Sequence, residues 1–267
     1  MRGRFTRTDT ELQPHYATPL DRAAMPQDPA LQNQIHYLQT QAHYPACRNT
    51  DVTYYGDTNA ALEAQKTDLR KAQHFIFMEY HAIEDSIAWQ GIEDILAERA
   101  AAGVEVRVFY DDMGSIGFVD TAFAKKLQQR GIQCRVFNPI VPVLNVFMNN
   151  RDHRKITVID GQVGYTGGYN LADEYFNLTH PYGRWKDSGV RLEGDAVRNL
   201  TLIFLEMWGT TQKEMPAIEP YLPAIRYTAR EAATVLPYAD NPLDDKRVGE
   251  DVYLNFINSA QRYVYIT

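Results

Sequence analysis

The sequence predicts an α/β protein with a mixed, largely parallel central sheet and helices on the faces of that sheet. Short apolar runs of strand length alternate with longer amphipathic segments between residues 51 and 137, a pattern typical of parallel strands joined by helices. Gly103 and Gly131 stand where two of these helices should end. A later predicted strand, residues 151–159, ends in four apolar or β-branched residues and is followed by Asp160 and a glycine, a pair typical of an antiparallel hairpin.

Length and composition limit the possible functions. The chain has 267 residues, of which 45% are hydrophobic and 23% charged, so it can form one large domain or two small ones. Its formal net charge of -7 argues against a protein whose main role is to coat nucleic acid. Cys47 and Cys134 lie far apart without metal-ligand spacing, so we expect free thiols in a reducing compartment.

Membrane-spanning segments are not predicted. No apolar run approaches the roughly 20 residues needed to cross a bilayer, and no signal peptide opens the chain. We therefore expect the chain as given to be soluble. A membrane partner, or an anchor outside this chain, is compatible with that expectation.

The chain divides by composition into four segments. Residues 1–50 are polar and rich in proline, so we expect an irregular lead-in with one short helix near residues 31–41. Residues 51–210 hold the alternating elements and form the predicted domain. Residues 211–250 are rich in proline and charge and are predicted to be a linker. Residues 251–267 are predicted to begin a second domain.

The second domain is predicted from a repeat. Residues 259–267 follow the pattern of residues 71–79, because in both a helix ends in Ala-Gln and continues into an aromatic and aliphatic strand. The sequence ends just as this second copy begins. We therefore expect the chain to be a fragment of a longer protein with two lobes.

Elements of the first domain are assigned from the spacing of apolar residues. Asn59 is expected to cap the first helix. The predicted strands are residues 52–56, 74–79, 104–110, 132–137, 151–159, 162–165 and 189–192, and the predicted helices are residues 59–72, 83–101, 118–130, 171–176 and 196–208. Ligands of such sheets bind at the carboxyl ends of strands. Glu79, Asp111 and Asn138 lie at those ends, and with Arg151 they mark a possible pocket.

Residues 139–148 are apolar and contain two prolines, so they cannot form an ordinary helix or a central strand. The favoured interpretation is a loop tucked onto the core. The alternative is an apolar lip beside the site that touches lipid.

The strongest chemical signal is a motif of the form H-x-K-x4-D in residues 149–170. On a strand, His153 and Lys155 point to the same face. An imidazole beside a fixed ammonium suits nucleophilic attack on phosphorus, because the ammonium stabilises the charge that grows in the transition state. The imidazole must be neutral to attack and needs a carboxylate to orient it. Asp187 is the candidate for that role.

The end of the motif, of the form G-G-x-N, suits a phosphate. Gly167 and Gly168 allow a close approach of backbone, and Asn170 is predicted to open the helix that follows. A helix N-terminus with exposed N–H groups binds anions. We therefore expect Lys155, Gly168 and Asn170 to bind phosphate, while Asp160 is predicted to be a turn residue within the motif.

Taken singly, each residue also fits a structural role. Asn170 fits a helix cap completed by Asp173, and Asp187 fits a capped turn. A lone lysine is more often solvated than catalytic, and a lone histidine is more often packed. The functional interpretation rests on the conjunction of the motif, the hairpin and the repeat.

In this motif the sequence resembles the HKD proteins of the phospholipase D superfamily, and its surroundings resemble bacterial cardiolipin synthases. The resemblance covers about residues 50–210 and resumes at 251–267. The segments that carry it are residues 54–56, 75–80, 103–107, 110–115, 150–155, 167–175 and 185–187. It implies a phospholipase-D-like α/β/α sandwich.

The resemblance implies a phosphatidyl transfer. In the family, a histidine attacks the phosphate of one phosphatidylglycerol, a phosphohistidine forms, and a second phosphatidylglycerol takes the phosphatidyl group to give cardiolipin. It implies that His153, Lys155 and Asp187 are catalytic, with no metal and no cofactor. The implied partners are a phospholipid, the cytoplasmic face of the bacterial inner membrane, and either a second HKD lobe or a homodimer partner, with no nucleic acid.

Three departures from the family pattern matter. The second HKD motif and the usual transmembrane anchors are absent from this sequence, and Asp152 stands where the family often has asparagine. We therefore expect little or no synthase activity from this chain alone. Open alternatives are a phospholipid hydrolase, a nuclease, a metal-dependent phosphotransferase that uses Asp111 and Asp112, and a non-catalytic half-enzyme that binds lipid.

Overall fold

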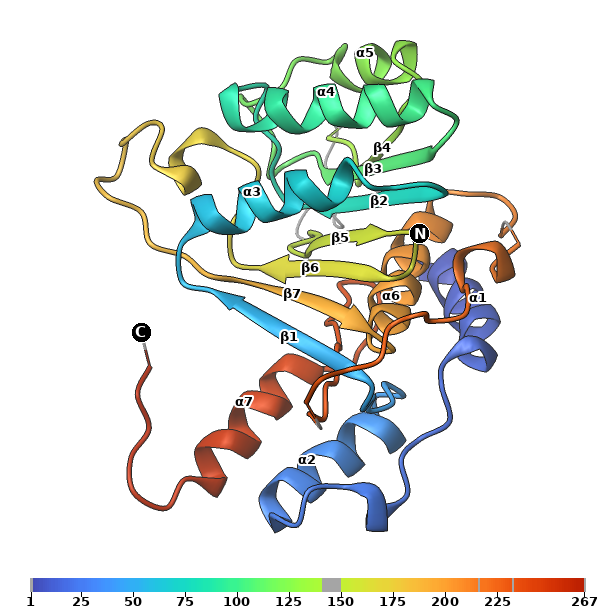
Figure 1. The fold of residues 1–267 in the computed structure, drawn as a ribbon, viewed down its shortest axis with the longest axis vertical. Coiled ribbons are helices and arrows are strands. Elements are labelled where there is room, and N and C mark those ends of the chain that lie inside the picture. The colour runs from blue at the N-terminus through green and yellow to red at the C-terminus, as the bar shows by residue number, and fades with distance from the viewer. Residues whose placement is uncertain (1, 141–149, 216, 232, 267) are drawn as a thin grey trace.

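The computed structural model describes residues 2–140, 150–215, 217–231 and 233–266. A seven-stranded sheet runs through its centre in the order β1-β7-β6-β5-β2-β3-β4 (Figure 1). The strands are β1 (Thr50–Tyr55), β2 (Phe75–Tyr80), β3 (Glu105–Asp111), β4 (Gln133–Phe137), β5 (Lys155–Ile159), β6 (Val163–Gly167) and β7 (Gly189–Gly194).

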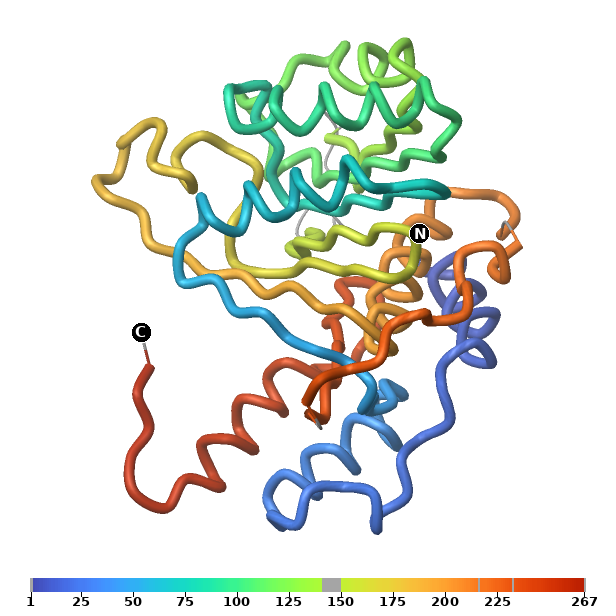
Figure 2. The backbone as a smooth tube through the Cα atoms, in the orientation of Figure 1, coloured from blue at the N-terminus to red at the C-terminus, as the bar shows by residue number. Residues whose placement is uncertain are grey.

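Helices cover both faces of this sheet, which confirms the predicted α/β/α sandwich (Figures 1 and 2). One layer holds α3, α4 and α5, and the other holds α6 with α1 packed against it. The helices are α1 (Arg2–Leu12), α2 (Pro29–Thr40), α3 (Thr58–Leu69), α4 (Ile87–Ala101), α5 (Phe123–Gln129), α6 (Val197–Thr210) and α7 (Val248–Ser259), and the 3-10 turns are η1 (Gln13–His15), η2 (Arg22–Ala24), η3 (Asp173–Phe176) and η4 (Glu219–Tyr221).

Alternate residues of β2 supply the two cores. Phe75 and Phe77 belong to the core on the α6 side, whereas Ile76 and Met78 belong to the core under α3 and α4. Phe77 stacks on Phe204 of α6 with ring centroids 4.5 Å apart. Full burial of one such side chain contributes roughly 1.5–3 kcal/mol, so β2 anchors both layers of the sandwich.

The sheet is mixed, as predicted, but the expectation of a largely parallel sheet is wrong. Only the β2–β3 and β3–β4 pairs are parallel. The β1–β7, β7–β6, β6–β5 and β5–β2 pairs are antiparallel. Helices cross between neighbouring strands only at α4 and α5, whereas short connections join β5 to β6, and short turns require antiparallel neighbours.

The turn between β5 and β6 has the predicted hairpin geometry. Asp160 and Gly161 both adopt positive φ, 52° and 62°, as the central residues of a type I′ turn do. The Asp160 carboxylate also accepts hydrogen bonds of 2.8 Å from the backbone N–H groups of Gln73, His74 and Phe75. The turn residue therefore ties the hairpin to the start of β2.

Helix starts in the first domain differ from the predictions. Asp57, not Asn59, caps α3, because its carboxylate accepts a hydrogen bond from the Asn59 N–H. Helix α4 begins at Ile87 rather than at residue 83, and α5 begins at Phe123 rather than at residue 118. The cap of α4 comes from a distant residue, since Asp173 accepts from the Ala88 N–H.

The N-terminal segment is more ordered than the predicted irregular lead-in. Helix α1 buries Phe5 and Leu12 in the core formed with α6. Helix α2 confirms the short helix expected near residues 31–41, with Asp28 as its cap and Pro29 as its first residue. The prediction missed α1 because this helix carries few apolar residues.

Residues 211–250 run along the domain rather than away from it. Val235 exchanges backbone hydrogen bonds with Cys47, and Tyr221 packs its ring edge-on against Phe75. Helix α7 follows. A strand was expected at residues 262–267, but the described part of that segment, residues 262–266, is not a strand. α7 buries only Val248 and Val252.

Candidate functional site

The His153 loop, residues 150–154, lies across the carboxyl ends of the parallel strands. Asp111 ends β3, is fully buried, and accepts hydrogen bonds from the Asp152 N–H (2.9 Å) and from Arg151 (3.1 Å). Asn138 follows β4 and donates to the Asn150 carbonyl at 3.0 Å. Strand ends that were expected to line a pocket therefore hold the loop that carries His153.

His153 and Lys155 are brought together at the entry to β5. The Lys155 Nζ lies 2.8 Å from the His153 carbonyl and 3.3 Å from the His153 Nδ1. An ammonium can only donate, so Nδ1 accepts in this arrangement. His153 stands just before the strand rather than on it, but the expected juxtaposition of the two side chains is present.

Burial sets the charges of this pair. Burial, then the neighbouring Lys155 and His81, lower the pKa of His153 to about 4. Burial also lowers the pKa of Lys155 to about 8, while Asp152 and Asp187 oppose that change. At neutral pH the imidazole is therefore uncharged and the amine is mainly an ammonium, which is the combination that nucleophilic attack on a phosphate ester requires.

His81 is a site residue that the sequence did not single out. It follows β2, and its ring lies against the ring of His153 with centroids 4.6 Å apart. Its Nδ1 lies 2.7 Å from the Asp152 carbonyl. Its position one residue after an apolar strand was the only available signal.

A buried charged cluster lies behind the His153 loop. Arg154 donates to Glu206 at 3.0 Å and lies 3.7 Å from Glu79, which is fully buried. Burial first, and then Asp152, raise the pKa of Glu79 well above its ordinary value. Burial also raises the pKa of Asp152. Glu79 and Asp152 are thus two interacting buried carboxyls whose pKa values are both raised, and Glu79 lies behind the loop instead of lining an open pocket.

Asp187 does not contact the imidazole in the part of the chain that the structure describes. Its carboxylate accepts from the Ser188 N–H at 2.8 Å and lies against Gly168, where any Cβ would clash with it. Its charge acts on Lys155 instead. A Cβ on Gly167 would lie 2.6 Å from the Ser188 carbonyl, so both glycines are needed for the close approach of residues 187–189.

The expected anion site at a helix N-terminus after Asn170 is not formed. The helix is only a 3-10 turn, η3, which begins at Asp173. The Asn170 amide accepts from the Ala82 N–H at 3.0 Å and donates to the Tyr175 hydroxyl at 2.9 Å. Leu171, directly after Asn170, forms a β-bridge with Ile83 and is not part of a helix.

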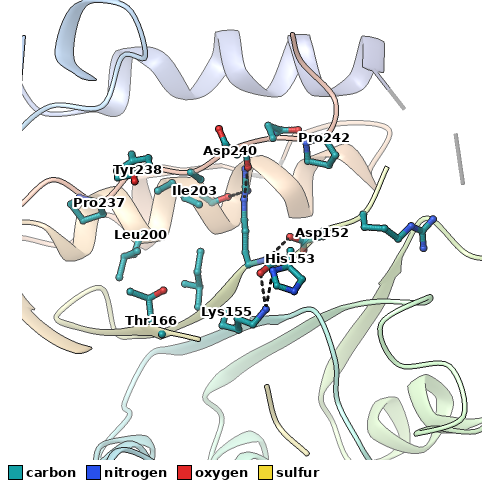
Figure 3. A pocket seen from close by; sticks show the side chains of 16 residues that line it. Asp152, His153, Lys155, Thr166, Leu200, Ile203, Pro237, Tyr238, Asp240 and Pro242 are labelled. Atoms are coloured by element: carbon teal, nitrogen blue, oxygen red, sulfur yellow. Dashed lines mark hydrogen bonds between the residues drawn. The ribbon is translucent and has the colours of Figure 1, made fainter. Parts of the chain in front are cut away.

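A pocket of about 560 Å³ opens beside His153 and Lys155 (Figure 3). One wall comes from the His153 loop and β5. The opposite wall comes from α6 and the segment after residue 236, and its apolar members are Leu200, Ile203, Pro237, Ala239 and Pro242. The His153–Lys155 pair and these apolar residues therefore line one cavity.

Asp111 and Asp112 each accept a hydrogen bond from the backbone of a loop. Asp111 holds the His153 loop, and Asp112 accepts from the Ile140 N–H at 2.6 Å. Among the described residues, no three histidine, cysteine or acidic side chains gather as a metal site would require.

Most of the apolar segment 139–148 lies outside the described residues. No described helix is both long and apolar enough to span a bilayer.

The fold and the His153–Lys155 pair define a phospholipase-D-like domain. A family model described as "Cardiolipin synthase, PLD-like domain" matches residues 66–208. The chain belongs to this cardiolipin synthase PLD-like domain family.

Relatives in sequence agree with this assignment. An uncharacterized protein of Streptococcus mutans is 44% identical over 223 residues, which cover 84% of this chain and 48% of that protein. Cardiolipin synthase 2 of Staphylococcus epidermidis is 34% identical over 221 residues, which cover 82% of this chain and 45% of that protein. The chain thus spans about half the length of these relatives.

Two solved structures are similar to part of this chain at low sequence identity. NucT from Helicobacter pylori matches with a TM-score of 0.46 and 11% identity, over 60% of this chain and 97% of that one. Nuc from Salmonella typhimurium, a phospholipase D family member, matches with a TM-score of 0.44 and 15% identity, over 62% and 95% of the two chains.

Proposed function

We propose that this chain carries one half of a phosphatidyltransferase site that makes cardiolipin from two phosphatidylglycerols. The observation that carries the proposal is the pairing of a neutral imidazole with a buried ammonium. With a pKa of about 4, His153 is uncharged at neutral pH, and with a pKa of about 8, Lys155 is mainly charged. Such a pair can attack a phosphodiester and stabilise the charge that develops.

The proposed chemistry has two steps. A ring nitrogen of His153 forms a bond to phosphorus, the bond to the glycerol oxygen breaks, and glycerol leaves after taking a proton. The hydroxyl of a second phosphatidylglycerol then attacks the phosphohistidine, gives up its proton, and releases cardiolipin. Lys155 binds the phosphate oxygens in both steps, and Asp187 tunes the charge of Lys155. Gly167 lines the same pocket.

A lipid substrate is supported by the pocket and by the relatives. The pocket is lined by Lys155 together with apolar residues that include Leu200 and Pro237, which suits a phosphate attached to an apolar body. Relatives named cardiolipin synthase share a third of their aligned residues with this chain. We propose action at the cytoplasmic face of the bacterial inner membrane.

The other half of the site is proposed to come from a second lobe that begins near residue 251. Helix α7 exposes one apolar side, and so does the segment that follows it; the exposed members are Tyr253, Leu254, Phe256, Ile257, Tyr263, Val264, Tyr265 and Ile266. An apolar surface of this kind is typical of an interface. In this arrangement residues 51–210 form the first lobe and residues 211–250 connect the two. A second copy of this chain is the alternative partner.

Product analysis tests the proposal. The chain is mixed with phosphatidylglycerol vesicles, and glycerol, cardiolipin and phosphatidic acid are measured. We expect at most one glycerol released per chain, a phosphatidyl adduct on His153, and neither product with His153→Ala. Release of phosphatidic acid over many turnovers would instead support a phospholipid hydrolase. Nicking of plasmid DNA without lipid turnover would support a nuclease.

A further inference from the structure

His81 holds the His153 loop on both sides of His153. Its backbone N–H donates to the Arg154 carbonyl at 3.1 Å, and its ring Nδ1 lies 2.7 Å from the Asp152 carbonyl. A carbonyl oxygen can only accept, so Nδ1 of His81 carries a proton. His153 therefore stands between two residues that are both bound to His81.

The ring of His81 also contacts the ring of His153. The ring centroids are 4.6 Å apart and the planes are inclined at 54°. Behind His81 lies Gly114, where a Cβ would come within 2.7 Å of the His81 Cε1 and Nε2 and would clash with the His81 carbonyl. The His81 ring is thus confined between Gly114 and the loop, and it can support His153 from a fixed position.

The remaining charged groups around His153 come from two other strands. Lys155, at the start of β5, contacts the His153 Nδ1 at 3.3 Å, and Asp111, at the end of β3, acts on the imidazole through its charge. Under the proposed function Lys155 also binds the phosphate, so its ammonium is not a fixed support for the imidazole. The ring contact from His81 then supports the imidazole, while His81 and Asp111 both bind the backbone of the loop.

We propose that His81 is a positioning residue, which fixes the His153 imidazole for attack through its Nδ1–H bond to Asp152 and its ring contact. The inference rests on the proposed function for what His153 attacks, but the contacts themselves do not depend on it. A displacement of about 1 Å of a reacting group can cost on the order of 100-fold in rate. Loss of the Nδ1–H donor should therefore slow the attack strongly.

The test uses two variants of His81, in which an amide side chain replaces one or the other ring nitrogen. The Asn side chain places its NH₂ where Nδ1 stood, whereas the Gln side chain places its NH₂ where Nε2 stood. The probe is bis(p-nitrophenyl) phosphate, because p-nitrophenolate leaves with the electron pair of the broken P–O bond and needs no proton donor. The His153 nitrogen forms the new bond to phosphorus, and its ring proton passes to water.

We measure the single-turnover burst of p-nitrophenolate at neutral pH. His81→Gln should slow the burst on the order of 100-fold, and His81→Asn should stay within about tenfold of the unsubstituted chain. Equal losses in both variants would overturn the positioning role and indicate proton transfer through Nε2. Equal rates in all three chains would overturn it as well. Melting temperatures of the variants show whether either substitution disturbs the fold.

Histidine spectra decide the inference even if the chain gives no burst. The sequence has 7 histidines, so selective ¹⁵N and ¹³C labelling resolves them. We expect the His81 proton on Nδ1, and one His153 side-chain rotamer in the unsubstituted chain and in His81→Asn but averaged rotamers in His81→Gln. A His81 proton on Nε2 alone, or an unchanged His153 rotamer in His81→Gln, would overturn the inference. A missing burst with the expected spectra would count against the proposed function only.

Discussion

Replacement of Lys155 by methionine should make the protein more stable and the site much less reactive. Lys155 is only 5% exposed, and burial lowers its pKa from 10.5 to about 8. A lowering of this size corresponds to about 3 kcal/mol of free energy spent to keep the amine charged in the folded state. Methionine has a similar length and no charge. It forfeits the hydrogen bond to the His153 carbonyl, worth about 1 kcal/mol, so the net gain should be about 2 kcal/mol.

The pH dependence of this gain has a definite sign. The unfolded chain binds a proton at Lys155 more tightly than the folded chain, so the cost is fully present below pH 8 and disappears as pH rises toward 10.5. The advantage of Lys155→Met should therefore be largest near pH 7 and fall to less than half by about pH 10.

Urea unfolding at both pH values measures the effect, and the melting temperature at pH 7 should rise by roughly 4–8 °C. Lys125 is exposed, and Lys125→Met serves as the matched control with an expected change within about 0.5 kcal/mol. Inorganic phosphate should stabilise the unsubstituted chain but not Lys155→Met. A Lys155→Met protein that is less stable at pH 7, or a gain that does not change with pH, would refute the account of a desolvated ammonium.

Three further predictions follow from the same contacts. The burst rate with bis(p-nitrophenyl) phosphate should be bell-shaped in pH, falling below about pH 4 as His153 becomes protonated and above about pH 8 as Lys155 loses its charge; a rate that keeps rising above pH 8 would contradict this. Asp187→Asn should move the alkaline limb to lower pH, because the Asp187 charge raises the pKa of Lys155; an unmoved limb would exclude this coupling. Asp160→Ala should lower the free energy of unfolding by about 2–3 kcal/mol in urea titrations, since three backbone N–H groups lose their acceptor; a change below about 0.5 kcal/mol would show that water replaces the carboxylate.

Local patterns predicted the elements of the fold better than their arrangement. The hairpin at Asp160 follows from two adjacent residues that accept positive φ, so the sequence alone identifies it. The balance of parallel and antiparallel pairs does not follow from local signals, because β5 pairs with β2 only in the folded sheet. The cap of α4 is equally non-local, since Asp173 lies far along the chain from Ala88.

The site shows the same division. The motif identified His153 and Lys155, and the strand ends identified Asp111, because each carries its signal in neighbouring residues. His81 was missed because one histidine after an apolar strand has no distinctive context. The expected bond from Asp187 to the imidazole is not found, since the close packing on Gly168 directs that carboxylate to the backbone of Ser188.

The central claim is that His153 is the nucleophile of a phosphodiester site. The most direct measurement is to treat the chain with bis(p-nitrophenyl) phosphate at neutral pH, quench in alkali, digest, and locate the phosphorylated residue by mass spectrometry. The account predicts one p-nitrophenyl phosphate group per chain on His153, strongly reduced in Lys155→Met and absent in His153→Ala. Modification on another residue, or a burst that survives in His153→Ala, would contradict it.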